Sequence, residues 1–233
     1  MCAGQDGDGR VGQALDDEPR TRAAQFTPKK KTLYDNQRDT ARVKKARRTF
    51  VSYRAKELHP LAERLHFLDE FGAHLGMTRT YGRAAPGKRV PEGTPDYSGP
   101  HYTVVATLSL TGIAAPWVIE GAMNGAAFAT YAQHELGPSL QAGDILIIDN
   151  LSAHKNAEAR AALEARGVHV VFLPPYSADY NPIELCWSKV KQALRSAKAR
   201  TFDALLEAVR TALLAVLPDQ AHGWFKHCGY PSA

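Results

Sequence analysis

Short apolar runs bounded by turn residues dominate the chain from residue 64 onward. Residues 102–110 alternate between apolar and polar side chains and are rich in β-branched types, which predicts a strand. Thr111-Gly112 predicts a hairpin turn that leads into a second strand at 116–120. A further short apolar run at 65–68, which ends in Asp69-Glu70, also predicts a strand. The first half of this region is therefore expected to be a sheet.

The second half mixes buried strands with helices. Residues 145–148 and 168–173 are continuous apolar runs, typical of strands covered on both faces. Alanine-rich and periodic segments predict four helices between and after them, the last two closing the chain: 126–135, 157–166, 182–195 and 202–217. The order of the elements predicts an α/β fold, a mixed sheet flanked by helices.

Upstream of the sheet the chain has a different character. Residues 1–25 contain almost no large apolar side chains, which predicts a disordered leader. Residues 33–57 predict a basic helix, because their apolar residues are too sparse to form a core face. The predicted domains are thus the leader at 1–25, a basic helical arm or linker at 26–60, and a folded domain at 61–233.

The positive charge of the chain lies mostly in this arm. Residues 20–56 carry thirteen basic and two acidic side chains, whereas residues 57–233 carry fifteen and seventeen. A basic arm on a nearly neutral body favours a polyanionic partner, most often nucleic acid, although a solvated helix explains the charge equally well. The candidate DNA-binding residues of the arm are Lys29, Lys30, Lys31, Lys44, Lys45, Arg47 and Arg48.

Composition narrows the class of protein. The chain has 233 residues, of which 44% are hydrophobic and 23% charged, as in ordinary globular proteins. No apolar stretch is long enough for a membrane span, and residues 1–10 lack the apolar core of a signal peptide. Three widely spaced cysteines form neither a disulfide framework nor a zinc motif. We therefore expect a cytoplasmic protein with no membrane partner.

Three carboxylates occupy places where such a sheet presents side chains to solvent. Asp69 follows the strand at 65–68, Asp149 follows the strand at 145–148, and Glu184 lies in the first turn of the helix that Pro182 begins. If the two strands are parallel neighbours, their ends lie about 5 Å apart. Carboxylates so placed can hold divalent ions, Mg²⁺ or Mn²⁺ rather than zinc. Each acid alone also fits a structural role, as a turn residue or as part of a capping box.

The sequence segments that contain these acids resemble those of a known family. Residues 66–72, 148–155 and 173–184 are similar to the signature blocks of transposases of the insertion-sequence 630 group, within the Tc1/mariner superfamily. The interval between Asp149 and Glu184 is 34 residues, the acid spacing associated with that group. The resemblance covers about residues 26–230. Further matching segments are 79–83, 187–191 and 227–230.

This resemblance implies a ribonuclease-H-like fold with a DDE triad of Asp69, Asp149 and Glu184. The implied activity is that of a DNA transposase: metal-dependent hydrolysis at transposon ends, with two Mg²⁺ or Mn²⁺ ions, followed by attack of the freed 3′-hydroxyl on target DNA, typically at TA. The implied partner is double-stranded DNA. Two ions stabilise the attacking and leaving oxygens without a protein nucleophile.

Several other residues are candidates for supporting roles. Asn150, His154 and Asn181 flank the three acids and are candidates to orient them or a water molecule. On the helix after Pro182, Ile183, Trp187, Val190 and Leu194 form the predicted buried stripe, and Glu184, Ser188, Lys191 and Arg195 follow the same rhythm one residue later. Lys191 and Arg195 are therefore candidate DNA contacts. A solvated basic edge remains the alternative.

The resemblance also exposes a departure from the family. Full-length members carry helix-turn-helix modules before the catalytic domain, and residues 1–56 have no room for two of them. We therefore expect a catalytic half, either the downstream reading frame of an element whose two frames are joined by frameshifting or a truncated copy. The expected partners include a helix-turn-helix product of an upstream reading frame and a second copy in a homodimer. Two other functions stay open: a ribonuclease-H-type nuclease that does not join DNA, and a non-catalytic DNA-binding fragment that competes with intact transposase.

Overall fold

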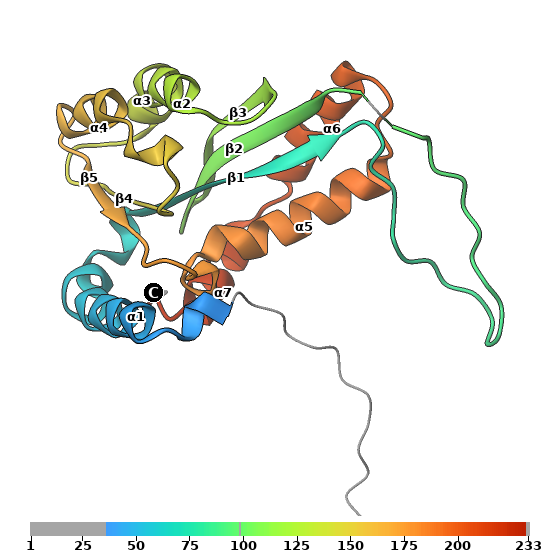
Figure 1. Ribbon diagram of the computed structural model, residues 1–233. Coiled ribbons are helices and arrows are strands. Elements are labelled where there is room, and N and C mark those ends of the chain that lie inside the picture. Colours follow the sequence, from blue (N-terminus) through green and yellow to red (C-terminus); the bar gives the residue numbers. More distant parts are fainter. Residues whose placement is uncertain (1–35, 98, 232–233) are drawn as a thin grey trace, which may run out of the picture. The chain divides into compact units, whose positions relative to one another are not determined.

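A five-stranded mixed sheet forms the centre of the computed structural model, which describes residues 36–97 and 99–231 (Figure 1). The strand order is β3-β2-β1-β4-β5, with β1 antiparallel to β2 and parallel to β4. The α/β fold class expected from the sequence is confirmed. The strands are β1 (Leu65–His74), β2 (His101–Ser109), β3 (Gly112–Glu120), β4 (Ile145–Ile148) and β5 (His169–Phe172).

Helices cover both faces of this sheet (Figure 1). On one face lie α2 (Gly125–Tyr131), η4 (Ala132–Leu136), α3 (Gly137–Ser139), η5 (Ala153–Lys155) and α4 (Ala157–Glu164). On the other lie α5 (Pro182–Ala197), α6 (Phe202–Leu214) and α7 (Pro218–His227), with η6 (Ala178–Tyr180) leading into α5. Before the sheet come η1 (Asn36–Asp39), α1 (Ala41–Tyr53), η2 (Arg54–Leu58) and η3 (His59–Arg64).

The alternation of β1 explains why two hydrophobic cores form. Phe67 and Phe71 point toward α5 and its neighbours, whereas Leu68 points toward α2 and α4. Phe71 packs against Trp187, with ring centroids 4.8 Å apart, so α5 is fixed along β1. The predicted stripe on α5 is confirmed, since Ile183, Trp187, Val190 and Leu194 are all buried. The core thus holds the helix of Glu184 against the strand of Asp69.

Three elements differ from the sequence prediction. β3 begins at Gly112 and not at residue 116, because it pairs with β2 directly from the turn. β1 does not end at residue 68 but continues to His74, because β2 pairs with it along the whole of this length. A third helix, α7, follows α6, which ends at Leu214. Pro218 begins α7, in a position where the missing N–H of proline costs nothing. Asp69 is therefore a residue within a strand, and the C-terminal helices number three within the described residues.

The basic helix α1 packs on the body instead of standing apart as an arm. Its apolar residues are few, yet Val43 and Phe50 are both buried, and the Phe50 ring stacks on Tyr180, with centroids 5.8 Å apart. Asp35–Ala233 forms one compact unit. Residues 36–60 therefore pack on the body and do not stand apart from it, while the predicted leader at 1–25 lies outside the described residues. The division of the chain at residues 25 and 60 stays a prediction.

A network of charged and aromatic groups secures α1 to the loop before α5. Arg47 donates hydrogen bonds to both carboxylate oxygens of Asp179, at 2.9 and 2.6 Å, and to Ser177 Oγ and Tyr176 O. Its guanidinium also lies 4.2 Å from the centre of the Tyr180 ring. This planar, bidentate arrangement suits arginine and not lysine. We call Arg47 and Asp179 the α1 clamp.

Among the residues that the structure describes, no helix has both the length and the apolar character needed to cross a membrane.

Candidate active site

Asp69 and Asp149 come from neighbouring parallel strands. β1 and β4 pair from Leu65↔Ile145 to Phe67↔Ile147, and the continuation of this register places Asp149 level with Asp69. Parallel neighbours lie about 5 Å apart. All four residues of β4 are buried, so Asp149 is the first residue after it that can present a carboxylate to solvent. The expected parallel pairing of these two strands is confirmed.

Glu184 completes the group from the opposite side. Pro182 begins α5, and Glu184 lies in its first turn, facing the same pocket as the two aspartates. The pocket has a volume of about 510 Å³. Its wall also includes Arg42, Asn150, Lys155, Asn181 and the segment 173–178. One strand, the end of a second strand and one helix therefore bring all three predicted acids to one cavity.

The electrostatics of this pocket favour a cation. Burial, together with the negative charges of Glu184, Glu70 and Asp149, raises the pKa of Asp69 to about 8. Burial and the charge of Asp149 raise the pKa of Glu184, and Lys191 opposes this rise. Both shifts arise because ionised carboxylates are crowded into one partly buried place. A bound cation relieves exactly that cost, so the donor set fits a divalent metal ion.

Asp149 is held by the chain that follows it. Its Oδ1 accepts a hydrogen bond from Leu151 N at 3.0 Å and lies 2.6 Å from His154 Nδ1. His154 is buried, and burial lowers its pKa, but its contacts with Asp149 and Glu70 outweigh burial and raise the pKa to about 9. Protonated His154 therefore donates to Asp149. The partner of Asp149 Oδ1 is fixed, while Oδ2 keeps its lone pairs for the pocket.

Glu70 lies behind His154 on the other side of the imidazole. Its Oε2 is 3.2 Å from His154 Nε2, near enough for an ion pair, but the two atoms do not meet with hydrogen-bond geometry. Glu70 follows Asp69 on β1, so its side chain points to the opposite face of the sheet. A line of charges, Glu70, His154 and Asp149, thus supports one member of the acidic group.

Asn181 and Asn150 both line the pocket. Asn181 is buried, and its Oδ1 has no hydrogen-bond partner within the described residues. It stands at the N-cap position of α5, yet its side chain makes no capping hydrogen bond. The expected capping role of this side chain is therefore absent. A buried amide oxygen that faces a polar cavity is a suitable acceptor for a water molecule or a ligand for a cation.

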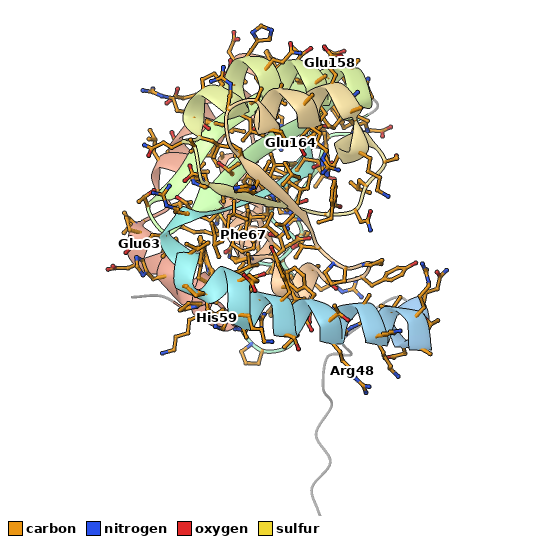
Figure 2. The ribbon with its side chains drawn as sticks, turned by 90° about the vertical axis from the view of Figure 1, so that its left-hand side faces the viewer. Arg48, His59, Glu63, Phe67, Glu158 and Glu164 are labelled. Atoms are coloured by element: carbon orange, nitrogen blue, oxygen red, sulfur yellow. The ribbon has the colours of Figure 1, made fainter. Side chains whose placement is uncertain are left out.

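The candidate DNA-binding residues of the arm divide into three groups. Lys44, Lys45 and Arg48 are exposed on α1, and Figure 2 shows Arg48 directed away from the body. Arg47 belongs to the α1 clamp, where its side chain is only 12% exposed. Lys29, Lys30 and Lys31 lie outside the described residues. On α5, Lys191 and Arg195 are half-buried and line a separate cleft, described below.

No group of three or more His, Cys, Asp and Glu side chains is already closed into a metal cage within residues 36–97 and 99–231. The three acids line their pocket without converging on one point. Their chemistry nevertheless suits a hard cation, because all the donors are carboxylate or amide oxygens.

A family model described as "DDE superfamily endonuclease" matches residues 64–206, which include Asp69, Asp149 and Glu184. The chain belongs to this family. DDE-type domains act with divalent metal ions. No curated protein sequence matches this DDE endonuclease.

Solved structures of Mos1 transposase share the fold of this DDE endonuclease. The catalytic domain of Mos1 mariner transposase superposes with a TM-score of 0.55 and 14% identity, over 89% of this chain and all of that chain. The Mos1 mariner paired-end complex with Mn superposes with a TM-score of 0.68 and 16% identity, over 88% of this chain but 63% of that chain. The Mos1 strand transfer complex superposes with a TM-score of 0.65 and 16% identity, over 89% of this chain and 64% of that chain. The fold of the DDE endonuclease is therefore the ribonuclease-H-like fold of the Mos1 catalytic domain, and the chain spans just under two thirds of the Mos1 chains in these two complexes.

Sequence reasoning missed two features around the site. The role of Glu70 went unassigned, although its place directly after Asp69 puts a second carboxylate on the other face of the strand. The Arg47–Asp179 contact was missed because its members are 132 residues apart and neither lies in an obvious pattern. The aromatic Tyr180 between them was the one available signal, since arginine often stacks on aromatic rings.

Proposed function

We propose that this DDE endonuclease is the catalytic domain of a transposase that cleaves DNA at the ends of a mobile element and joins the freed 3′-hydroxyl to target DNA. The observation that carries the proposal is the pocket into which β1, the end of β4 and the start of α5 each deliver one carboxylate. Three acids on three rigid elements make a site for phosphodiester chemistry that needs no protein nucleophile.

Asp69, Asp149 and Glu184 are the proposed ligands of two Mg²⁺ or Mn²⁺ ions. When bound, such ions activate the attacking oxygen and stabilise the leaving one. The crowded carboxylates and the unpartnered Asn181 Oδ1 support this assignment, because both are costly without a positively charged or hydrogen-bonding occupant. The fit is to hard cations, as the donors are oxygens.

The surrounding residues position the acids and the DNA. Protonated His154 holds Asp149 by one oxygen and leaves the other free, so the orientation of this carboxylate is set before a substrate arrives. Glu70 balances the charge of His154 from behind. Arg42 and Lys155 on the wall of the pocket supply positive charge to the phosphates that flank the cleaved bond.

Double-stranded DNA is the proposed partner. The exposed residues Lys44, Lys45 and Arg48 are suited to phosphate contacts, and Lys191 and Arg195 continue along α5 from Glu184. Arg47 is left out of this set, because the α1 clamp occupies its guanidinium. Membership of the insertion-sequence 630 group is part of the proposal, supported by the signature blocks and the 34-residue interval. A homodimer, a helix-turn-helix product of an upstream frame and a cytoplasmic location also remain part of the proposal.

The same site would also suit a nuclease that cuts DNA without joining it, and this is the alternative function. The test uses a duplex with a precut element end and a second, target duplex, incubated with Mg²⁺ or Mn²⁺. Joined products support the transposase, whereas cleavage without joining supports the nuclease. Asp69→Asn, Asp149→Asn and Glu184→Gln should each abolish both activities while the circular dichroism spectrum stays unchanged.

Glu158→Gln provides the matched control, since Glu158 is an exposed carboxylate on α4, a helix that contributes no residue to the lining of the pocket. It should cleave like the wild type. If one of the three variants keeps wild-type cleavage at equal metal concentration, its carboxylate is not a ligand. If the wild type binds DNA but neither cuts nor joins it, the non-catalytic reading is correct.

A further inference from the structure

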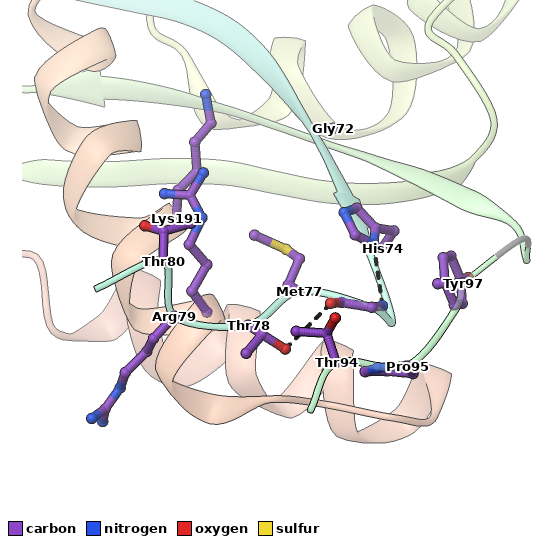
Figure 3. Close-up of a pocket in the computed structure, with 12 residues that line it drawn as sticks. Gly72, His74, Met77, Thr78, Arg79, Thr80, Thr94, Pro95, Tyr97 and Lys191 are labelled. Carbon is purple, nitrogen blue, oxygen red and sulfur yellow. Dashed lines mark hydrogen bonds between the residues drawn. The ribbon is translucent and has the colours of Figure 1, made fainter. Parts of the chain in front are cut away.

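A cationic cleft lies beside the active site, between α5 and the segment that follows β1. It consists of two adjoining hollows of about 800 Å³ each, which share Arg79, Thr80 and Arg195. Figure 3 shows the first hollow, where Thr94, Pro95 and Tyr97 of the loop lie across from Lys191. The second hollow is lined by Arg79, Thr80, Tyr81, Gly82, Arg83, Ser188, Gln192, Arg195 and Ser196. We call the second hollow the RTYGR groove, after residues 79–83.

The lining of this cleft is positively charged. Arg79 and Arg195 line both hollows, Lys191 lines the first and Arg83 the second, and neither lining includes an Asp or Glu. Within the part of the chain that the structure describes, none of the four cations forms an ion pair with a carboxylate. The Nε of Arg79 donates to Ser196 Oγ at 3.0 Å, which orients the guanidinium while its two Nη groups stay available. Such a surface attracts a polyanion.

The helix α5 connects this cleft to the acids. Glu184 lies in its first turn, and Ser188, Lys191 and Arg195 follow at four, seven and eleven residues. At 1.5 Å per residue, Arg195 lies about 16 Å along the helix axis from Glu184, the length of roughly five base steps of DNA. A strand cleaved at the acids that runs along α5 therefore reaches the RTYGR groove within a few nucleotides.

Tyr81 gives the groove an apolar surface. Its side chain is 87% exposed, the most exposed of the large hydrophobic residues in the described chain. The arginines on either side of it, Arg79 and Arg83, line the same groove. An exposed aromatic ring flanked by cations is what single-stranded DNA sites use: cations contact the backbone and a base stacks on the ring. Inside a duplex both faces of each base are covered by its neighbours, so no base is free to stack on such a ring.

We propose that the RTYGR groove binds an unpaired stretch of the DNA strand next to the cleaved bond, with Arg79, Arg83 and Arg195 on its phosphates and Tyr81 stacked on a base. This proposal rests on the proposed function for the identity of the DNA, but it concerns binding and not cleavage. Because stacking on Tyr81 needs an extruded or terminal base, the groove favours DNA with a single-stranded extension over fully paired DNA.

The first test measures binding of the full chain, in EDTA so that nothing is cleaved, to a blunt duplex and to the same duplex with a single-stranded thymidine extension. The wild type should bind the extended duplex about tenfold more tightly, the usual contribution of one stacked base. Tyr81→Ala should remove most of that gain, whereas Tyr81→Phe, which keeps the ring, should retain it. Equal binding of the two duplexes, or a full gain in a folded Tyr81→Ala variant, overturns the proposal.

A second test addresses the phosphate contacts. The double variant Arg79→Gln/Arg83→Gln should lower the salt dependence of binding to single-stranded DNA by about 1.4 in the log-log slope, near 0.7 for each contact. Its matched control is Arg160→Gln/Arg210→Gln, which removes the same charge from exposed sites on α4 and α6. The proposal fails if both double variants change the slope equally.

The two proposals fail in different ways. If the Tyr81 and groove-arginine variants change binding as expected but the wild type never cleaves DNA with Mg²⁺ or Mn²⁺, the groove proposal is supported and the proposed function is refuted. If the wild type cleaves and joins DNA but neither set of variants changes DNA binding, the proposed function is supported and the groove proposal is refuted.

Discussion

Asp69 lines the pocket at the start of α5, Asp179 lies in η6 just before α5, and the two aspartates show opposite electrostatics. Burial and neighbouring carboxylates raise the pKa of Asp69 to about 8. Burial also acts to raise the pKa of Asp179, but the hydrogen bonds and charge of Arg47 outweigh it and lower the pKa. Among the described residues Asp69 has no ion-pair partner, whereas Asp179 has a bidentate one. The difference separates the proposed metal site from a contact that is complete by itself.

The largest expected effect is on cleavage. Asp149→Asn should lower metal-dependent DNA cleavage by about 10³-fold or more, because it removes a ligand charge and keeps the shape. Asp179→Asn should leave cleavage within about threefold, because Asp179 serves the α1 clamp. Initial rates on one labelled duplex measure both. Equal losses of cleavage rate in the two variants would show that the two aspartates do not differ in their importance for catalysis.

A second effect concerns the stability that the α1 clamp provides. Arg47→Ala should lower the free energy of unfolding by about 3 kcal/mol, since it removes four hydrogen bonds and the stacking on Tyr180. Arg48→Ala, on the exposed side of the same helix, should change it by less than about 0.5 kcal/mol. Urea unfolding followed by circular dichroism compares them. A small effect for Arg47→Ala would show that α1 is held by Val43 and Phe50 alone.

The third effect is a substitution that stabilises the protein, whereas most substitutions destabilise it. In metal-free buffer at neutral pH, Asp69→Asn should raise the free energy of unfolding by about 1–2 kcal/mol, because the folded state must protonate this carboxyl whereas the unfolded state keeps it ionised, and asparagine carries no such cost. Added Mn²⁺ should raise the Tm of the wild type more than that of the variant. Thermal melts with and without metal decide this, and Asp203→Asn, an exposed aspartate on α6, is the control. A destabilised Asp69→Asn in the absence of metal would mean that the carboxylate is already satisfied.

The smallest effect is a pH dependence of the clamp. The pKa of Asp179 is lowered in the folded state from its ordinary value of 3.8, so its contribution is complete above that value and is lost as the pH falls through the lower folded value. The stability difference between the wild type and Asp179→Asn is about 1 kcal/mol at neutral pH, because the Asp179 carboxylate is half-exposed, and it should shrink below about pH 4. A difference that grows toward acid pH would contradict the assigned pairing.

Local patterns were sufficient for much of the site. The apolar run 145–148 predicted a buried strand, and a buried strand places its first following polar residue, Asp149, at the edge of the sheet. Pro182 predicted the start of α5 and hence the first turn that carries Glu184. The strand at 65–68 was found but cut short, because Asp69 and Glu70 look like turn residues when their antiparallel partner β2 is not known.

The sequence by itself determined the three acids, the order of the elements and the buried stripe of α5, because each depends on residues that are close along the chain. Only the tertiary structure decided that α1 belongs to the body, that Arg47 is occupied by Asp179, and that His154 joins Asp149 to Glu70. It alone also placed residues 79–83 beside the far turns of α5. Contacts of this kind join residues separated by many positions, and the direction of a charged side chain depends on which partner the fold brings within reach. The periodicity and spacing of residues along the chain do not show which distant partner a charged side chain will contact.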